Sequence, residues 1–303
     1  MSERRAGLVA LIGAPNAGKS TLLNRMVGAR LAPVTRKVQT TRTRLRGIRM
    51  EGEAQIIFVD TPGLFRPGRR LDRAMVAAAW AGAGDADITA VLVDARRGVT
   101  SELRATIAEM PARLPADRPR VLILNKVDLV PRAQLLPLSA ELNALGDFAA
   151  SFMISAQTGS GTEVLARWLA GRLPAGPWLF PPDQIGDVPL RLHAAELTRE
   201  TLMDRLHDEL PYELTVEPET WQERSDGSVR ITQVIMVARS AHRPIILGRG
   251  GRTIAAIGKA SRTRIGAFLG REAHLSLDVR VAPRWQDDRE RYRAIGLDFD
   301  PRR

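Results

Sequence analysis

The 303-residue sequence contains no cysteine, which excludes disulfides, thiolate zinc sites and thiol catalysis. Aromatic residues are sparse, and no apolar run approaches the roughly 18 residues that a membrane-spanning helix needs. Residues 1–5 are mostly polar and lead straight into an apolar segment, so we expect no signal peptide. These absences predict a cytoplasmic protein, and the length predicts about two domains.

Acidic residues are missing from two stretches of a chain whose net charge is +11. Residues 28–49 hold seven bases and no acid, and residues 230–271 hold nine bases and no acid. Residues 191–226 carry ten acids and four bases, so the charge of the second half is sharply polarised. A run of one sign is usually a solvated face, but the second basic run surrounds a glycine loop and therefore favours a polyanionic partner.

A phosphate-binding loop is predicted near the N-terminus. Residues 13–20 read Gly-Ala-Pro-Asn-Ala-Gly-Lys-Ser, between an apolar strand over 8–12 and a helix over 20–27, and fit the pattern G-x-x-x-x-G-K-[ST]. Glycines let backbone N–H groups surround a phosphate, the lysine reaches the β- and γ-phosphates, and the serine holds the bridging Mg²⁺. The predicted nucleotide-binding residues here are Gly13, Asn16, Ala17, Gly18, Lys19, Ser20 and Thr21.

Two further segments are expected to complete the magnesium and γ-phosphate site. Thr41, inside the first basic run, is the predicted second hydroxyl ligand of Mg²⁺ from a loop that can move, with Thr40 as the alternative. The apolar strand over 55–59 leads into the sequence D-T-P-G. Its Asp60 is placed to hold the magnesium shell and to bind nucleotide with it, and the amide of Gly63 is placed to approach the γ-phosphate.

The chemistry of the site is assigned to a few of these residues. The predicted metal ligands are Ser20, Thr41 and Asp60. The residues expected to act in catalysis are Lys19, Thr41 and Gly63. Residue 64 is leucine, whereas some related nucleoside triphosphatases carry a water-orienting glutamine there, so we expect slow intrinsic hydrolysis.

A base-recognition motif follows the fourth buried strand as Asn125-Lys126-Val127-Asp128. The carboxylate of Asp128 can accept hydrogen bonds from both N1 and the 2-amino group of guanine, and adenine offers no such pair. Asn125 would steady the guanine edge and the phosphate loop, while the aliphatic stem of Lys126 covers the base. The small residues after the last predicted strand, which let a backbone N–H reach guanine O6, are Ser155 and Ala156.

Proline enrichment over 174–189 predicts a stiff linker between a GTP-binding domain, 1–173, and a second domain with a C-terminal tail, 190–303. The second domain reads as helix (191–210), strand, strand, helix, helix, strand. A G-x-x-G loop joins its last two helices; such a loop clamps about four nucleotides in the KH module, although a plain helix-joining turn is the alternative. The predicted RNA-binding residues are Gly248, Arg249, Gly250, Gly251 and Arg252.

The five nucleotide motifs together resemble the Ras-like class of GTPases, and the loop G-x-P-N-x-G-K-S resembles the Era and TrmE branch. The second half, including Leu210-Pro211-Tyr212 and Trp285, resembles the KH part of the Era family. The resemblance covers nearly the whole chain. It implies an α/β fold: a doubly wound P-loop GTPase domain with a smaller α+β type II KH domain. Asn16 occupies the position that this branch associates with a potassium ion, and a turn-capping role for it is the alternative.

The resemblance implies a GTP-hydrolysing switch that uses GTP/GDP and Mg²⁺, and activation by K⁺ is a further hypothesis. It would bind the 3′ end region of small-subunit ribosomal RNA and assist maturation of the small ribosomal subunit as a cytoplasmic monomer, with peripheral contact at the inner membrane left open. The alternative is an RNA-binding assembly protein whose GTP site is regulatory with negligible turnover. An ATP-dependent phosphotransferase is opposed by the base motif. Two departures stand out: Asp278 where relatives carry tryptophan, and the small loop residues Ala14 and Ala17.

Overall fold

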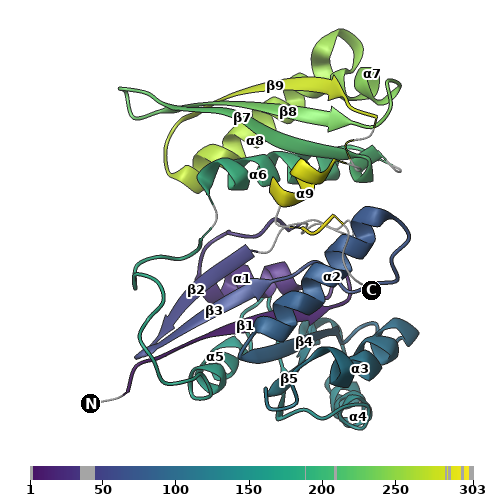
Figure 1. Cartoon of the computed structure of the whole chain (residues 1–303), viewed down its shortest axis with the longest axis vertical. Coiled ribbons are helices and arrows are strands. Elements are labelled where there is room, and N and C mark those ends of the chain that lie inside the picture. Colours follow the sequence, from purple (N-terminus) through teal and green to yellow (C-terminus); the bar gives the residue numbers. More distant parts are fainter. Residues whose placement is uncertain are drawn as a thin grey trace. The chain divides into compact units, whose positions relative to one another are not determined.

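The structure is a computed structural model that describes residues 3–34, 45–187, 189–207, 210–283, 285, 288–294 and 297–299. The described chain forms two compact units, each with its own sheet (Figure 1). The first takes the described residues of Met1–Ala32, Thr41–Asp187 and Tyr292–Arg303. The second takes those of Pro33–Thr40 and Val188–Arg291.

The first unit is built on a six-stranded sheet with the order β2-β3-β1-β4-β5-β6. β2 pairs antiparallel with β3, and the other neighbours pair parallel. The carboxyl ends of β1, β3, β4, β5 and β6 therefore lie at one edge of the sheet, where ligands of such folds bind. The strands are β1 (Arg5–Gly13), β2 (Leu45–Glu51), β3 (Ala54–Asp60), β4 (Ile88–Asp94), β5 (Arg120–Asn125) and β6 (Ala150–Met153).

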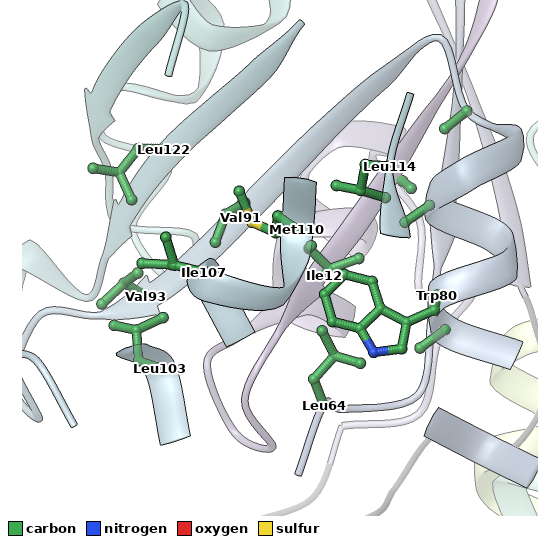
Figure 2. Packing of buried hydrophobic residues seen from close by; sticks show 14 of the residues in the cluster. Ile12, Leu64, Trp80, Val91, Val93, Leu103, Ile107, Met110, Leu114 and Leu122 are labelled. Atoms are coloured by element: carbon green, nitrogen blue, oxygen red, sulfur yellow. The ribbon is translucent and has the colours of Figure 1, made fainter. Parts of the chain in front are cut away.

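Helices cover both faces of this sheet, as the predicted doubly wound fold requires. α2, α3 and the end of α4 bury apolar side chains against β1, β4 and β5 (Figure 2). α1 and α5 contact each other and pack against β2 and β3. The helices are α1 (Lys19–Val27), α2 (Arg70–Asp85), α3 (Ser101–Arg113), the 3₁₀ turn η1 (Val127–Leu129), α4 (Arg132–Asn143) and α5 (Thr162–Ala170).

The second unit has a three-stranded sheet with the order β7-β8-β9, in which β7 is antiparallel and β9 parallel to β8. Side chains of α6, α7 and α8 share a core with the sheet, and the order of elements is that of the predicted type II KH fold. The elements are α6 (Leu190–Arg205), η2 (Leu210–Tyr212), β7 (Leu214–Glu223), β8 (Val229–Val237), α7 (His242–Leu247), η3 (Arg249–Gly251), α8 (Arg252–Leu269), β9 (Ala273–Val281) and α9 (Arg289–Ala294).

Two elements differ from the sequence-based expectations. α6 ends at Arg205, although a helix to residue 210 was predicted from its leucine spacing. Leu206 and Leu210 are nevertheless buried in the same core as Leu202. The leucine spacing therefore correctly indicated burial, although the helix ends before the last two leucines. β2 was not anticipated, because its Arg46 and Arg49 extended the first basic run. None of the described helices is both long enough and apolar enough to span a bilayer.

The predicted linker is held against the first unit over residues 174–187. The buried amide of Gln55 in β3 accepts from the backbone N–H groups of Leu179 (2.8 Å) and Phe180 (3.0 Å) and donates to the Phe180 carbonyl (2.8 Å). Further along, the Ile48 N–H of β2 donates to the Ile185 carbonyl at 3.0 Å. Segment 174–187 is therefore a strap on the sheet of the first unit, and the division between the units falls after it.

Candidate nucleotide site and glycine loop

The predicted phosphate loop connects β1 to α1 at the carboxyl edge of the sheet. Gly13 and Gly18 adopt φ values of 146° and 100°, which disfavour side chains. A Cβ atom at Gly13 would lie 2.4 Å from the Leu92 carbonyl oxygen, and one at Gly18 would lie 2.2 Å from Nδ2 of Asn125. Both glycines are therefore required by close packing as well as by backbone conformation. The other predicted loop residues lie between them or at the start of α1.

Lys19, at the start of α1, folds its ammonium group over this loop. Its Nζ donates to the carbonyl oxygens of Gly13 and Ala14, each at 3.0 Å. Burial lowers the pKa of Lys19 from 10.5 to about 8, and the negative charge of Asp60 opposes that shift. A phosphate group in the loop would restore the lost solvation of the ammonium, as expected for a residue that reaches the β- and γ-phosphates.

The predicted magnesium ligands Ser20 and Asp60 are brought together. Ser20 Oγ donates to Asp60 Oδ2 at 2.7 Å, and the carboxylate is fully buried. A hydroxyl and a carboxylate are the hard oxygen ligands that Mg²⁺ accepts, and the ion usually takes its remaining ligands from phosphates and water. The described residues contain no group of three or more His, Cys, Asp or Glu that could hold a metal alone. Thr41, the third predicted ligand, and its alternative Thr40 lie outside the described residues.

The turn after β3 packs directly on the phosphate loop. A Cβ atom at Gly63 would lie 2.9 Å from both the ring Cγ and the backbone nitrogen of Pro15, so only glycine allows this approach. The N–H of Leu64 donates to the Gly13 carbonyl at 2.9 Å. The Leu64 side chain is buried in the core beside Ile12 and the indole of Trp80 (Figure 2). Residue 64 therefore has no polar side-chain group that could orient water, and its side chain belongs to the core.

Asn125 joins the predicted base site to the phosphate loop. It is 1% exposed; its Nδ2 donates to the Ala17 carbonyl at 2.9 Å, and its Oδ1 accepts from the Ala156 N–H at 2.9 Å. The sequence predicted that a backbone N–H of this segment reaches guanine O6, and in the structure the Ala156 N–H is bonded to Asn125. Ser155 is fully buried beside it, and the carboxylate-bearing Asp128 follows β5 at an exposed position.

Two residues that contact this site belong to none of the sequence motifs, and their contacts were not predicted. Arg25 of α1 donates from Nε to the Ala156 carbonyl at 3.2 Å, and its Nη2 also donates to the Gln157 carbonyl. Asp94, at the end of β4, accepts from Nζ of Lys126 at 2.6 Å. In the sequence, Arg25 is one more basic residue of the predicted helix over 20–27, and Asp94 is the aspartate that ends the apolar segment 88–94. No local signal in the sequence distinguishes either of them.

The G-x-x-G loop of the second unit has the backbone that its glycines permit. Gly248, Gly250 and Gly251 have φ values of 73°, 60° and 74°. A Cβ atom at Gly248 would lie 2.1 Å from Oγ1 of Thr253, whereas at Gly250 and Gly251 it would meet nothing within 4 Å. The first glycine is therefore needed for close packing and the next two for backbone conformation, which leaves the loop surface open to a ligand.

Exposed bases without an acidic partner surround this loop. Three bases of the run 230–271 form ion pairs with acids outside it: Arg239 with Glu213, Arg264 with Asp204, and Arg271 with Glu223. The bases on α7, the glycine loop and α8 that are exposed and form no ion pair with a described residue are Arg243, Arg249, Arg252, Lys259 and Arg262. The loop therefore lies in a positive surface of the kind that binds a phosphodiester backbone.

Asp278 takes part in a charged network on β9. Its Oδ2 accepts from Nε of Arg280 at 2.8 Å, and Arg280 also pairs with Glu219 of β7 at 2.7 Å. These side chains are about half exposed. An ion-pair network thus stands where the resemblance led us to expect an aromatic side chain.

The fold and the site define a P-loop GTPase domain followed by a KH module. Residues 8–126 match the family described as 50S ribosome-binding GTPase, and residues 209–286 match the KH domain family. Over nearly its whole length the chain belongs to the GTPase Era family and is therefore a GTPase. It is 57% identical to GTPase Era of Dinoroseobacter shibae over 295 residues, which cover 97% of this chain and 96% of that one. GTPase Era of Brucella suis is 54% identical over 298 residues, covering 98% and 95%.

Solved structures of the family share the complete fold. Aquifex aeolicus Era, as a point variant bound to GDP·AlF4⁻, superposes with a TM-score of 0.90 at 34% identity, covering 96% of this chain and 99% of that chain. Era in complex with MgGDPNP and nucleotides 1506–1542 of 16S ribosomal RNA also has a TM-score of 0.90 at 34% identity, covering 97% and 99%. Both domains are thus present in one chain in these solved structures of the family.

Proposed function

We propose that this GTPase is a GTP-operated switch that binds the 3′ end region of small-subunit ribosomal RNA and assists maturation of the small ribosomal subunit. The observation that carries the proposal is the open G-x-x-G loop inside a surface of five exposed bases that pair with no described acid. A relative with the same fold is solved with 16S ribosomal RNA and a GTP analogue. Bound RNA would place its backbone on Arg249 and Arg252.

The nucleotide residues divide the work of binding and hydrolysis. Ser20, Asp60 and Thr41 would hold Mg²⁺, which neutralises charge on the β- and γ-phosphates. Lys19 supplies a further positive charge to the same phosphates, and the backbone of Gly63 contacts the γ-phosphate. Because residue 64 is a leucine, which cannot orient water as a glutamine would, we expect intrinsic hydrolysis to be slow and the attacking water to be placed by backbone, metal ion or a partner.

Base selectivity provides a direct test of the proposed guanine contact. Asp128→Asn replaces one of the two acceptor oxygens by an N–H donor, which suits the carbonyl that xanthine carries in place of the 2-amino group of guanine. We expect the variant to lose GDP affinity and to gain affinity for xanthosine diphosphate. Isothermal titration with both nucleotides measures the exchange, and unchanged preference for GDP would remove Asp128 from the base site.

RNA coupling separates the switch from a regulatory GTP site with negligible turnover. Phosphate release is measured with and without the 3′ end fragment of ribosomal RNA, and RNA affinity is measured with GDP and with a GTP analogue. A switch requires both turnover and a nucleotide-dependent affinity. RNA affinity that is the same in both states, or hydrolysis that RNA never raises above background, favours the regulatory alternative.

The basic surface has its own test in the salt dependence of RNA binding. Arg249→Gln combined with Arg252→Gln should reduce the slope of log affinity against log salt by about 1.4, at roughly 0.7 per single-strand phosphate contact. Arg104→Gln is the matched control, since this exposed arginine of α3 pairs with Glu141 in the first unit. A slope that is equal in both variants would contradict RNA contact at this loop.

The potassium assignment and the assembly state are finer parts of the proposal. We expect GTP hydrolysis to be faster in potassium than in sodium buffer, because Asn16 lies in the phosphate loop at the position where the family resemblance implies a potassium ion. Equal rates in the two buffers would contradict the potassium assignment.

We further propose a cytoplasmic monomer, so sedimentation equilibrium should return the mass of one chain. Flotation with vesicles of inner-membrane lipids tests peripheral association.

A further inference from the structure

The two left-handed, non-glycine residues among the described residues are Asn16 and Lys126, with φ values of 62° and 65°. Such conformations cost on the order of 1–3 kcal/mol each and persist only when neighbouring groups enforce them. Asn16 belongs to the phosphate loop and Lys126 to the proposed base site. The two strained positions therefore lie in the two halves of the nucleotide site.

One ammonium group links both strained positions. Nζ of Lys126 donates to the carbonyl oxygen of Asn16 at 2.6 Å and to Oδ2 of Asp94 at 2.6 Å. The Asp94 side chain is 6% exposed and that of Lys126 is 26% exposed, so this ion pair is shielded from solvent on the carboxylate side. A charge-assisted pair of this kind is stronger than a surface ion pair because less water screens it.

The carboxylate of Asp94 is itself fixed by the backbone around it. Asp94 pairs in register with Asn125 at the ends of β4 and β5. Its Oδ1 accepts from the Arg96 N–H at 3.1 Å. The N–H of Ala95, the residue directly after Asp94, donates to the Asn125 carbonyl at 2.9 Å. Asp94 is thus a rigid support at the edge of the sheet, whereas the four-carbon side chain of Lys126 has many rotamers in solution.

From this geometry we infer that Asp94 is a positioning residue for guanine-nucleotide binding, acting through Lys126. By holding Nζ, the carboxylate lays the aliphatic stem of Lys126 in the orientation that covers a base. The same ammonium keeps the carbonyl of Asn16 turned as the phosphate loop requires. The conformational entropy of the flexible Lys126 side chain is lost before the nucleotide binds and not during binding, so nucleotide affinity is higher. The inference rests on the base site proposed above, which Asp128→Asn tests separately.

A double-mutant cycle tests whether Asp94 acts through Lys126. Asp94→Asn keeps an oxygen acceptor for the Arg96 N–H but removes the charge that holds the ammonium. We expect the dissociation constant for GDP to rise about tenfold in this variant, equivalent to about 1.4 kcal/mol. In a Lys126→Met background, where no ammonium remains to be held, the same change should alter affinity by less than about twofold.

Asp87→Asn is the matched control, because Asp87 precedes the other end of β4. It accepts from the Leu8 N–H at 2.8 Å and pairs with Arg118 at 2.6 Å. We expect this change to lower the melting temperature without changing GDP affinity. Asp94→Ser provides a second uncharged variant in case the asparagine variant does not fold.

Two results would overturn the inference. One is GDP affinity that is unchanged in folded Asp94→Asn or Asp94→Ser protein. The other is an equal loss of affinity with and without Lys126, which would mean that Asp94 supports the sheet and not the lysine. If instead Asp128→Asn fails to change base preference while the cycle still shows coupling, the proposed base contact is wrong and the Asp94–Lys126 support of the loop stands.

Discussion

Replacing Lys19 by methionine should make the nucleotide-free protein more stable. Lys19 is 6% exposed, and the carbonyl oxygens of Gly13 and Ala14 accept hydrogen bonds from its ammonium group. Its lowered pKa shows that these oxygens and Asp60 do not compensate the loss of water around the charge. Methionine has a similar length and no charge, so Lys19→Met removes the desolvation cost together with the ability to bind phosphate.

The size of the effect follows from the pKa of Lys19. A shift from 10.5 to about 8 means that the charged form is destabilised in the folded protein by about 3 kcal/mol relative to the unfolded chain. Near neutral pH the residue is protonated in both states, so the full cost is present. For a unit of about 150–250 residues, this corresponds to a melting temperature roughly 6–12 °C higher in the variant.

The pH dependence has a defined sign. Between about pH 8 and pH 10.5 the unfolded chain binds more protons at this position than the folded protein does. The stability of the unsubstituted protein at this site therefore rises with pH across that window. The advantage of Lys19→Met should accordingly be largest below pH 8 and shrink above it.

Thermal unfolding of nucleotide-free protein, followed by tryptophan fluorescence, measures both effects. GDP should raise the melting temperature of the unsubstituted protein by mass action and should leave that of Lys19→Met nearly unchanged. Lys259→Met is the control, because Lys259 is exposed on α8 and its replacement should change stability by no more than about 0.5 kcal/mol. A Lys19→Met protein that is no more stable below pH 8, or whose advantage does not depend on pH, would refute the reasoning.

Three further substitutions have outcomes fixed by close contacts. Gly18→Ala should reduce GDP affinity more than about tenfold in a titration, because the new Cβ would displace the Asn125 amide. Leu64→Gln should lower stability by about 1–3 kcal/mol without raising phosphate release, since its amide would enter the core; faster release would contradict this orientation. Gln55→Leu should speed chymotryptic cleavage within 174–187, because backbone groups of the strap lose their partners; unchanged cleavage would show that Gln55 does not hold it.

The nucleotide elements could be predicted because each combines a buried strand with the loop directly after it. In a parallel sheet the carboxyl ends of such strands meet at one edge, so motifs far apart in sequence become neighbours. Asn125 illustrates the result: its amide spans from Ala17 to Ala156, which are predicted nucleotide residues from separate loops. The need for glycine at two positions of the phosphate loop could also be predicted from the motif. In the structure, Gly13 and Gly18 have φ values that residues with side chains rarely adopt.

Contacts between residues distant in sequence explain what could not be predicted. Arg25 reads as one more basic residue of a helix, and only the fold brings it to the loop at 156–157. Asp94 ends an apolar strand as many aspartates do, and its function depends on a lysine 32 positions later. The predicted end of α6 was wrong for a related reason. Leu210 continues the leucine spacing of α6 because the core extends past the end of the helix.

The proline-rich strap shows how one composition fits two structures. Prolines stiffen a spacer, but they also suit a segment that covers the edge of a sheet, because they offer no N–H for another strand to pair with. β2 is one of the two edge strands of the sheet in the first unit. The Gly186 backbone bridges to Gly47 of β2, and a Cβ atom at Gly186 would lie 3.0 Å from Leu31 and 3.2 Å from the Arg46 carbonyl oxygen. Composition alone cannot distinguish a spacer from an edge cover, because the difference lies in the pairing partner, and that partner is some 140 residues earlier in the chain.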